Sequence, residues 1–266
     1  MRTFVLSLLT LAITNPSRAG AVDQAEGPAA PGETKRVRWA TAPPAERGTY
    51  RVRRMKENPT IDADWDKAAW RGVPPVILEY YMGEEPAHQP KVQAKAAYDD
   101  HFLYVIWKVE DRFVLARRTK HQQDVCRDSC VELFFTPGVV PEDRGYFNLE
   151  TNCAGVKLFG AHIVGGKDKK FTGEDFVSVA TASSLKGPID REMVQPTTWT
   201  LEYRIPLGLL ERHAKIERPG PGVTWRANFY KCADDTSHPH WLTWSPVTNA
   251  KPSFHLPKYF GILAFE

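Results

Sequence analysis

The stretch KVQAKAAYDDHFLYVIWKVED, residues 91–111, decides the fold class of the chain. It contains two apolar runs with valine, isoleucine and aromatic residues, and such residues favour β-strands. Asp99, Asp100 and His101 separate the runs, and a polar group of this kind between two apolar runs is typical of a turn. The stretch therefore predicts two consecutive β-strands joined by a turn.

Further strand-like segments follow this pair along the chain, up to the C-terminus. In TWTLEYRIP, residues 198–206, Trp199, Leu201 and Tyr203 share one face, and Pro206 ends the pattern. The other strand-like segments are CVELFF (130–135), YFNLETN (146–152), FVSVATAS (176–183), WRANFYKC (225–232), HWLTWSP (240–246) and FGILAF (260–265). The few helical patterns are DADWDKAAW (62–70) and LGLLERH (207–213). Many short strands separated by turns predict an all-β fold, an antiparallel β-sandwich with a few short helices.

The N-terminal residues 1–22, MRTFVLSLLTLAITNPSRAGAV, have the pattern of a secretory signal peptide. Arg2 precedes an apolar run, and small residues follow that run. The run is shorter than the roughly 20 residues that span a bilayer, so we expect no membrane span and a secreted or periplasmic mature protein. Residues 23–48, rich in Ala, Pro, Gly and charge, predict a flexible linker, which leaves residues 49–266 as one domain.

The charge balance and the missing catalytic motifs narrow the function. The net charge is +3, and part of it lies in the N-terminal segments. So small a charge does not indicate the clustered basic face that a nucleic-acid-binding protein needs. The sequence contains no GxSxG, HExxH or Walker motif. Glu132 stands between apolar residues in a predicted strand, where an acid is either paired or facing a site. Glu132 and Glu150 together leave a glycosidase pair open as an alternative.

Two prolines bracket an aromatic residue and a histidine in PSFHLPKYFG, residues 252–261. Because proline fixes φ and lacks an N–H, this segment predicts a rigid loop before the last strand. Phe254 and His255 then either plug the end of the core or face a ligand. With a sugar as the ligand, Phe254 would provide the stacking surface and His255 would bind a hydroxyl group.

Eight segments, in order along the chain, carry a resemblance to a known family. They are TIDADWDKAAW (60–70), AAYDDHFLYVIWKVED (96–111), DSCVELFF (128–135), YFNLETNCAG (146–155), WTLEYRIP (199–206), WRANFYKCADD (225–235), HWLTWSPV (240–247) and PSFHLPKYFGIL (252–263). Over residues 50–266 the chain resembles the family 9 carbohydrate-binding modules and their family-9-like relatives. The resemblance implies a jelly-roll-like β-sandwich that binds poly- or oligosaccharides, is not catalytic by itself and assists glycoside hydrolases in carbohydrate catabolism.

The resemblance also implies which residues bind the sugar. Asp111 and Glu132 match family acids that hydrogen-bond sugar hydroxyl groups. Phe254 matches one of two tryptophans that sandwich the sugar ring. Asn148 stands where sugar-binding members can place an arginine, and Tyr230 stands where they can place an amide side chain.

The cysteines accompany an export signal, and an oxidising compartment favours disulfides. Cys126 stands where the family resemblance expects the second sandwich tryptophan. Cys130 and Cys232 lie in segments that relatives share, whereas Cys126 and Cys153 look like additions of this chain. We therefore predict the pair Cys126–Cys153, with Cys130–Cys232 as a second pair or as free thiols. The cysteine spacing leaves zinc open, family members leave calcium open, and we expect no other cofactor.

Three other functions fit the same predicted architecture. A haem-binding DOMON-type sandwich would use Met82 or Met193 with a lysine or histidine as haem ligands. A glycoside hydrolase would act on O-glycosyl bonds with Glu132 as a catalytic group. An exported sandwich could also be purely structural. A Soret band, substrate turnover and silence on a glycan array, respectively, distinguish the three.

Overall fold

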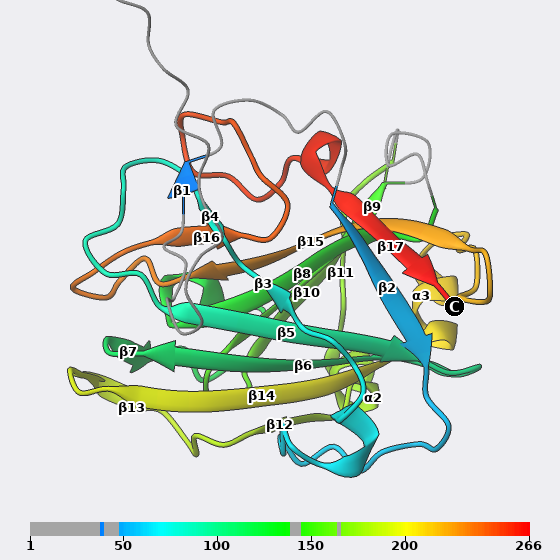
Figure 1. Ribbon diagram of the computed structural model, residues 1–266, viewed down its shortest axis with the longest axis horizontal. Helices are drawn as coiled ribbons and strands as arrows, with labels where there is room; N and C mark the ends of the chain where they lie inside the picture. The colour runs from blue at the N-terminus through cyan, green and yellow to red at the C-terminus, as the bar shows by residue number, and fades with distance from the viewer. Residues whose placement is uncertain (1–37, 40–47, 139–144, 164–165) are drawn as a thin grey trace, which may run out of the picture. The chain divides into compact units, whose positions relative to one another are not determined.

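Strands dominate the part of the chain that the computed structural model describes, residues 38–39, 48–138, 145–163 and 166–266 (Figure 1). The predicted signal peptide, residues 1–22, lies outside these residues, as does the predicted linker 23–48 apart from residues 38, 39 and 48. The α-helices of the described part are short, α2 (Gly173–Ser178) and α3 (Leu207–His213). Within that part, no helix is long and apolar enough to cross a membrane.

Most strands follow one another, each hydrogen-bonded to the next, in one large curled sheet (Figure 1). In spatial order they are β11 (Lys169–Lys170), β10 (Lys157–His162), β9 (Tyr146–Asn152), β8 (Cys130–Thr136), β15 (Thr224–Cys232), β17 (Gly261–Phe265), β2 (Thr49–Arg54), β5 (Lys91–Tyr98), β6 (Phe102–Asp111), β14 (Thr197–Pro206) and β12 (Thr181–Ser183). Attached to this order are β1 (Arg38–Trp39), β3 (Val76–Ile77), β4 (Tyr80–Tyr81) and β16 (Trp241–Thr243). β7 (Val114–Ala116) and β13 (Ile189–Met193) form a separate pair.

Most neighbouring strands are antiparallel, but the sheet is mixed. β2 enters between two groups of strands and runs parallel to both of its neighbours, β17 and β5. β1 also runs parallel to β4. The predicted β-rich fold with a few short helices is therefore confirmed, whereas the wholly antiparallel order is wrong. The jelly-roll topology stays a prediction.

The two strands that decided the fold class form as predicted. β5 and β6 pair in antiparallel register over nearly their full length. In the turn between them, Oδ1 of Asp99 accepts hydrogen bonds from the backbone N–H groups of His101 and Phe102, each at 2.7 Å. A side chain that bonds its own backbone in this way favours a turn over a continued strand.

Two predicted elements differ in the structure. Residues 176–183 do not form one strand, because they hold the end of α2 and, after a break, β12. A capping box begins α2, in which Asp175 Oδ2 accepts a hydrogen bond from the N–H of Thr172 at 2.8 Å. This local signal overrides the alternation of apolar residues. The helix predicted at residues 207–213 is confirmed as α3.

The helix predicted at residues 62–70 is reduced to a single 3-10 turn, η1 (Ala68–Trp70). Before it, the side chains of Asp62 and Asp64 each accept a hydrogen bond from the backbone N–H two residues further on, at 3.0 Å. Ala63 has a φ of 64°, which an α-helix does not permit. The aspartates therefore fold this segment into consecutive turns.

The main core lies between β5, β6 and β14 on one side and β8, β9 and β15 on the other (Figure 1). Trp107 of β6 and Phe229 of β15 meet there, with ring centres 5.5 Å apart. Because side chains alternate along a strand, Phe229 and Lys231 point into the main core. Tyr230 and Cys232 point the other way, into a second hydrophobic cluster. We call this other side of β8, β9 and β15 the outer face.

Candidate functional site

The outer face carries three rows of side chains that strand register holds together. From β9 through β8 to β15 the rows are Asn148–Phe134–Asn228, Glu150–Glu132–Tyr230 and Asn152–Cys130–Cys232. All of these residues are at most 5% exposed. Directly opposed residues of antiparallel strands have Cβ atoms roughly 5 Å apart, so each row is a line of neighbouring side chains. The register thus brings three predicted sugar-binding residues, Glu132, Asn148 and Tyr230, onto one surface.

The proline-bracketed loop covers this surface with Phe254. The Phe254 ring lies flat on Tyr230, with ring centres 4.1 Å apart and planes 11° from parallel. The hydroxyl of Tyr230 donates a hydrogen bond to the carbonyl oxygen of Phe254 at 3.2 Å. Phe254 is only 8% exposed, so its ring acts as a cover. Tyr230 occupies one face of the ring that was predicted to stack on a sugar.

His255 is exposed beside that cover, at the rim of the outer face. Its Nδ1 is 2.9 Å from the hydroxyl oxygen of Tyr146 on β9. Its ring centre is 5.0 Å from that of His162 on β10. Although the residue is exposed, its ring lies against Phe134 and His162. The resulting desolvation of the imidazole, and then the charge of His162, lower the pKa of His255 to about 4. His255 is therefore neutral at pH 7, with one ring nitrogen able to donate a hydrogen bond and the other able to accept one.

Two acids, Glu132 and Glu150, lie side by side in the middle row. Burial raises the pKa of Glu132 well above its ordinary 4.5, and the charge of Glu150 raises it further. Burial also raises the pKa of Glu150 to about 7. Asn148 Nδ2 donates to Glu150 Oε1 at 2.9 Å, while Asn148 Oδ1 has no hydrogen-bond partner in the described part of the chain. Protonated acids and an unpaired amide oxygen are groups that sugar hydroxyls can bond.

Asp111, the remaining acid of the predicted site, lies on the opposite side of β15. One carboxylate oxygen is 2.8 Å from His88 Nε2, and the other is 3.6 Å from Nζ of Lys231, which points into the main core. Burial alone would raise the pKa of Asp111, but Lys231 and His88 hold it below its usual value of 3.8. The structure therefore does not bring Asp111 together with Glu132 and places it in a separate, charge-paired cluster.

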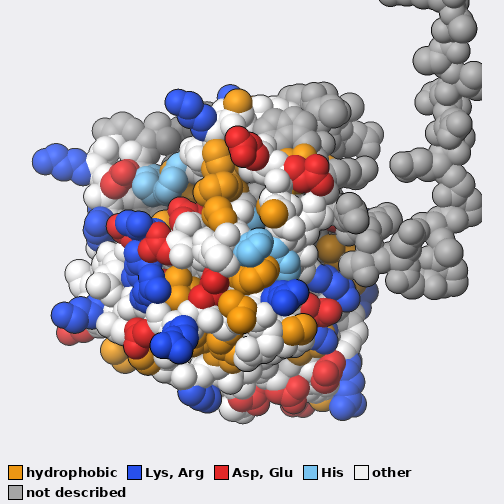
Figure 2. Space-filling model, turned by 90° about the vertical axis from the view of Figure 1, so that its left-hand side faces the viewer, with side chains coloured by type: hydrophobic (Ala, Val, Ile, Leu, Met, Phe, Trp, Pro, Cys, Tyr) orange, Lys and Arg blue, Asp and Glu red, His pale blue; other side chains and the backbone are white. Residues whose placement is uncertain are grey.

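That cluster lies at the end of the molecule shown in Figure 2, where β6 and β15 end. Lys231 Nζ donates to His240 Nε2 at 2.8 Å, and burial, then the charge of Lys231, lower the pKa of His240 to about 3. Nearby, the rings of Phe113 and His238 stack with centres 3.7 Å apart. Figure 2 shows hydrophobic and histidine side chains gathered near the middle of this end, with charged side chains around them. We interpret the cluster as structural, because its charges are paired.

The cysteines are free thiols in the structure. The predicted pair Cys126–Cys153 is therefore not formed, and Cys130 and Cys232 take the free-thiol alternative. Cys153 packs in the main core, whereas Cys126 packs against the outer-face cluster. These two thiols lie on opposite sides of the sheet and cannot bond. Cys130 and Cys232 stand directly opposite each other on β8 and β15, but as separate thiols.

The methionines considered as haem ligands are packed side chains. Met82 is fully buried in the outer-face cluster, and Met193 packs against the main core. Flexible thioethers commonly fill irregular gaps in this way. We therefore interpret Met82 as a core residue and Met193 as a partly buried packing residue. The hydrolase alternative for Glu132 stays a prediction.

Sequence reasoning missed several members of the outer face, in particular Phe134, Asn228 and Tyr146. A signal for the missed tyrosine was present in YFNLETN, where the even-numbered residues share one face of the strand. What the sequence did not contain was which strands lie beside this one. The register of β9, β8 and β15 supplies that information.

A β-rich domain that groups acids, amides and aromatic rings on one sheet face has the composition of a sugar-binding module. Comparison with known proteins identifies the family. The chain belongs to carbohydrate-binding family 9, because the model of that family matches residues 64–265. No curated protein matches the chain.

Solved structures share the fold. A candidate carbohydrate-binding protein from Bacteroides uniformis ATCC 8492 is 28% identical, with a TM-score of 0.73, and the match covers 83% of this chain and 100% of that one. A family 9 module from Caldicellulosiruptor kristjanssonii in complex with glucose is 17% identical, with a TM-score of 0.56, over 81% of this chain and 95% of that one. The same organism's family 9 module in complex with cellotriose gives the same identity and TM-score, over 82% and 94%.

Proposed function

We propose that this chain is a secreted carbohydrate-binding protein that is not catalytic by itself and works beside glycoside hydrolases in carbohydrate catabolism. Membership of family 9 supports carbohydrate binding. The predicted signal peptide supports export. The complexes of the related modules make glucose and cellotriose the first ligands to test.

The observation that carries the proposal is the convergence of Glu132, Asn148 and Tyr230 on the outer face beneath Phe254. Asn148 Oδ1 is buried and unpaired, and an unpaired buried acceptor costs roughly 1–3 kcal/mol until a donor reaches it. A sugar hydroxyl is such a donor. The exposed His255 offers a first contact at the rim. For a sugar to reach the floor, the Phe254 ring must move off Tyr230 and stack on the sugar instead.

Titration calorimetry with glucose and cellotriose, preceded by a glycan array, tests this site. Removing one stacked ring costs about 1 kcal/mol, so we expect Phe254→Ala to weaken binding at least about fivefold. Phe102→Ala is the matched control, because Phe102 is a partly exposed ring on β6, outside the site. It should leave the affinity unchanged.

The other outcomes are equally informative. Unchanged affinity in Phe254→Ala would place the sugar away from this loop. Tighter binding in that variant would identify Phe254 as a cover that excludes the sugar, and would overturn the proposed stacking. Silence of the wild type across the array would refute carbohydrate binding itself.

A further inference from the structure

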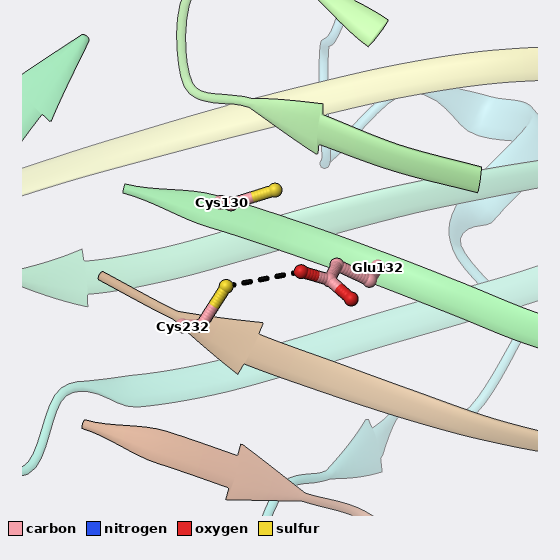
Figure 3. A group of neighbouring side chains, drawn as sticks. All are labelled: Cys130, Glu132 and Cys232. Atoms are coloured by element: carbon pink, nitrogen blue, oxygen red, sulfur yellow. Dashed lines mark hydrogen bonds between the residues drawn. The ribbon is translucent and has the colours of Figure 1, made fainter. Parts of the chain in front are cut away.

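Three potential metal ligands meet on the outer face: Cys130, Glu132 and Cys232 (Figure 3). Their ligand atoms, two Sγ atoms and a carboxylate oxygen, all lie within 4.8 Å of one another. The two cysteines are directly opposed across β8 and β15, and Glu132 follows Cys130 two residues along the same strand face. Strand register, rather than a loop, therefore holds the three groups together.

The hydrogen bonds of the three groups run to one another and to backbone carbonyls. Cys232 Sγ donates to Glu132 Oε1 at 3.0 Å and is 3.2 Å from the carbonyl oxygen of Cys126. Cys130 Sγ is 3.8 Å from a backbone carbonyl oxygen of its own strand. Lys231, the basic residue next to Cys232 in sequence, points to the opposite side of β15 and faces Asp111 there. The trio thus gathers three acidic groups at one buried point.

The three groups are buried together within the sheet. Cys130 is fully buried, and Glu132 and Cys232 are each 1% exposed. Their ligand atoms are therefore held close to one another and shielded from bulk solvent by the fold itself.

We propose that Cys130, Glu132 and Cys232 bind a zinc ion. Two thiolates and a carboxylate are ligand types that zinc prefers, whereas calcium and magnesium take oxygen ligands only. Tetrahedral Zn–S bonds of about 2.3 Å place two sulfur ligands roughly 3.8 Å apart, within the span that the trio covers. Binding breaks two S–H bonds and one O–H bond and releases three protons to solvent. A water molecule supplies the fourth ligand.

The zinc site goes beyond carbohydrate binding and does not depend on it. Glu132 belongs to both surfaces, but the cysteines lie in the row beyond Tyr230 and are not sugar contacts. A zinc ion would cross-link β8 to β15 and fix the Glu132 carboxylate beside Tyr230. It would therefore stabilise the floor of the outer face.

Direct metal analysis tests the site. The full chain is purified with reductant and chelator, desalted, incubated with zinc chloride, desalted again and analysed by elemental mass spectrometry. We expect one zinc per chain and a higher temperature of thermal unfolding. Calorimetry in two buffers of different ionisation enthalpy should show net proton release. Cys130→Ser and Cys232→Ser should each lose stoichiometric zinc.

Cys153→Ser is the matched control, because that thiol is as buried as the others but lies on the main-core side of the sheet. It should still retain one zinc. If a cysteine variant fails to fold, Glu132→Gln still tests the site. Glutamine has the shape of the protonated glutamic acid that it replaces, so the fold should be kept. This variant should weaken zinc retention. Titrating the same metal-free and zinc-loaded samples with cellotriose reports carbohydrate binding separately.

Three results would overturn the zinc site. One is a reduced wild-type protein that retains no zinc. Another is a loss of zinc in Cys153→Ser as large as that in Cys232→Ser. The third is calcium binding as tight as zinc binding, which would mean that the thiols are not ligands.

Discussion

Two buried acids on opposite sides of β15, Asp111 and Glu132, have opposite surroundings. Asp111 accepts a hydrogen bond from His88 and lies opposite the ammonium group of Lys231, so its negative charge is matched. Glu202, which is fully buried, likewise accepts hydrogen bonds from a lysine, a tryptophan and two backbone N–H groups. Glu202 is therefore saturated with donors. The charge of Asp111 is balanced by Lys231, although its Oδ2 has no hydrogen-bond partner among the described residues.

Glu132 has different neighbours. It accepts a hydrogen bond from the thiol of Cys232. Burial, and then the charge of the neighbouring Glu150, raise the pKa of Glu132 well above its ordinary value and so favour its protonated form. A carboxylate whose charge is balanced by a buried ammonium stabilises the fold, whereas a carboxyl group that keeps its proton has bonding capacity left for a ligand. The contrast between Asp111 and Glu132 therefore separates a structural acid from a site acid.

The largest effect should come from neutralising the structural acid. Asp111→Asn leaves the buried ammonium of Lys231 without its counter-charge, and breaking a buried pair in this way costs about 3–5 kcal/mol. Urea unfolding measures the change in the free energy of unfolding. A loss below about 1 kcal/mol would show that Lys231 loses its proton or finds another partner in the variant. The distinction between Asp111 as a structural acid and Glu132 as a site acid would then be wrong.

The pH dependence of the free energy of unfolding should come from the outer face, where Glu150 titrates. Glu150 has a pKa of about 7 in the fold and an ordinary value of 4.5, so the folded state holds its proton more tightly between these values. The stability that this group contributes is full below about pH 4.5 and is lost as the pH rises to 7. The loss is on the order of 3 kcal/mol at most.

Urea unfolding of wild type and Glu150→Gln at about pH 5 and about pH 7.5 checks this dependence. The variant should lose less stability than the wild type over that interval. Asp111 acts in the opposite sense, because its pKa is lowered: its contribution is present above pH 3.8 and is lost as the pH falls below that value. Equal losses in both proteins would mean that Glu150 is already ionised at about pH 5.

Local pattern was enough to predict much of the fold. Alternation and turn residues predicted β5, β6, β14 and α3, because these elements depend on signals within their own segments. The parallel pairing of β2 could not be predicted in this way, since it depends on which distant strands lie beside it. The start of α2 was missed because a capping box at Thr172 competes with an apparent strand pattern.

The residues of the candidate site likewise differ in whether local sequence pattern could predict their position. Glu132, Asn148 and Tyr230 come from segments whose alternation fixes their shared face once the strands are neighbours. Asp111 ends its strand, and only the tertiary structure shows that it lies across β15 from the others. The sequence likewise could not show that Phe254 rests on Tyr230, because a rigid loop can point its ring inward or outward with equal ease.

The smallest effect should come from Glu132→Gln, the matched partner of Asp111→Asn. Glutamine has the shape of the protonated acid, and its Oε1 can still accept the hydrogen bond from Cys232. In the metal-free protein at about pH 6 we therefore expect the free energy of unfolding to change by less than about 1 kcal/mol, the range of one neutral hydrogen bond. Urea unfolding with chelator present measures it. A cost as large as that of Asp111→Asn would mean that Glu132 is ionised and paired, and the distinction between the two acids would fail.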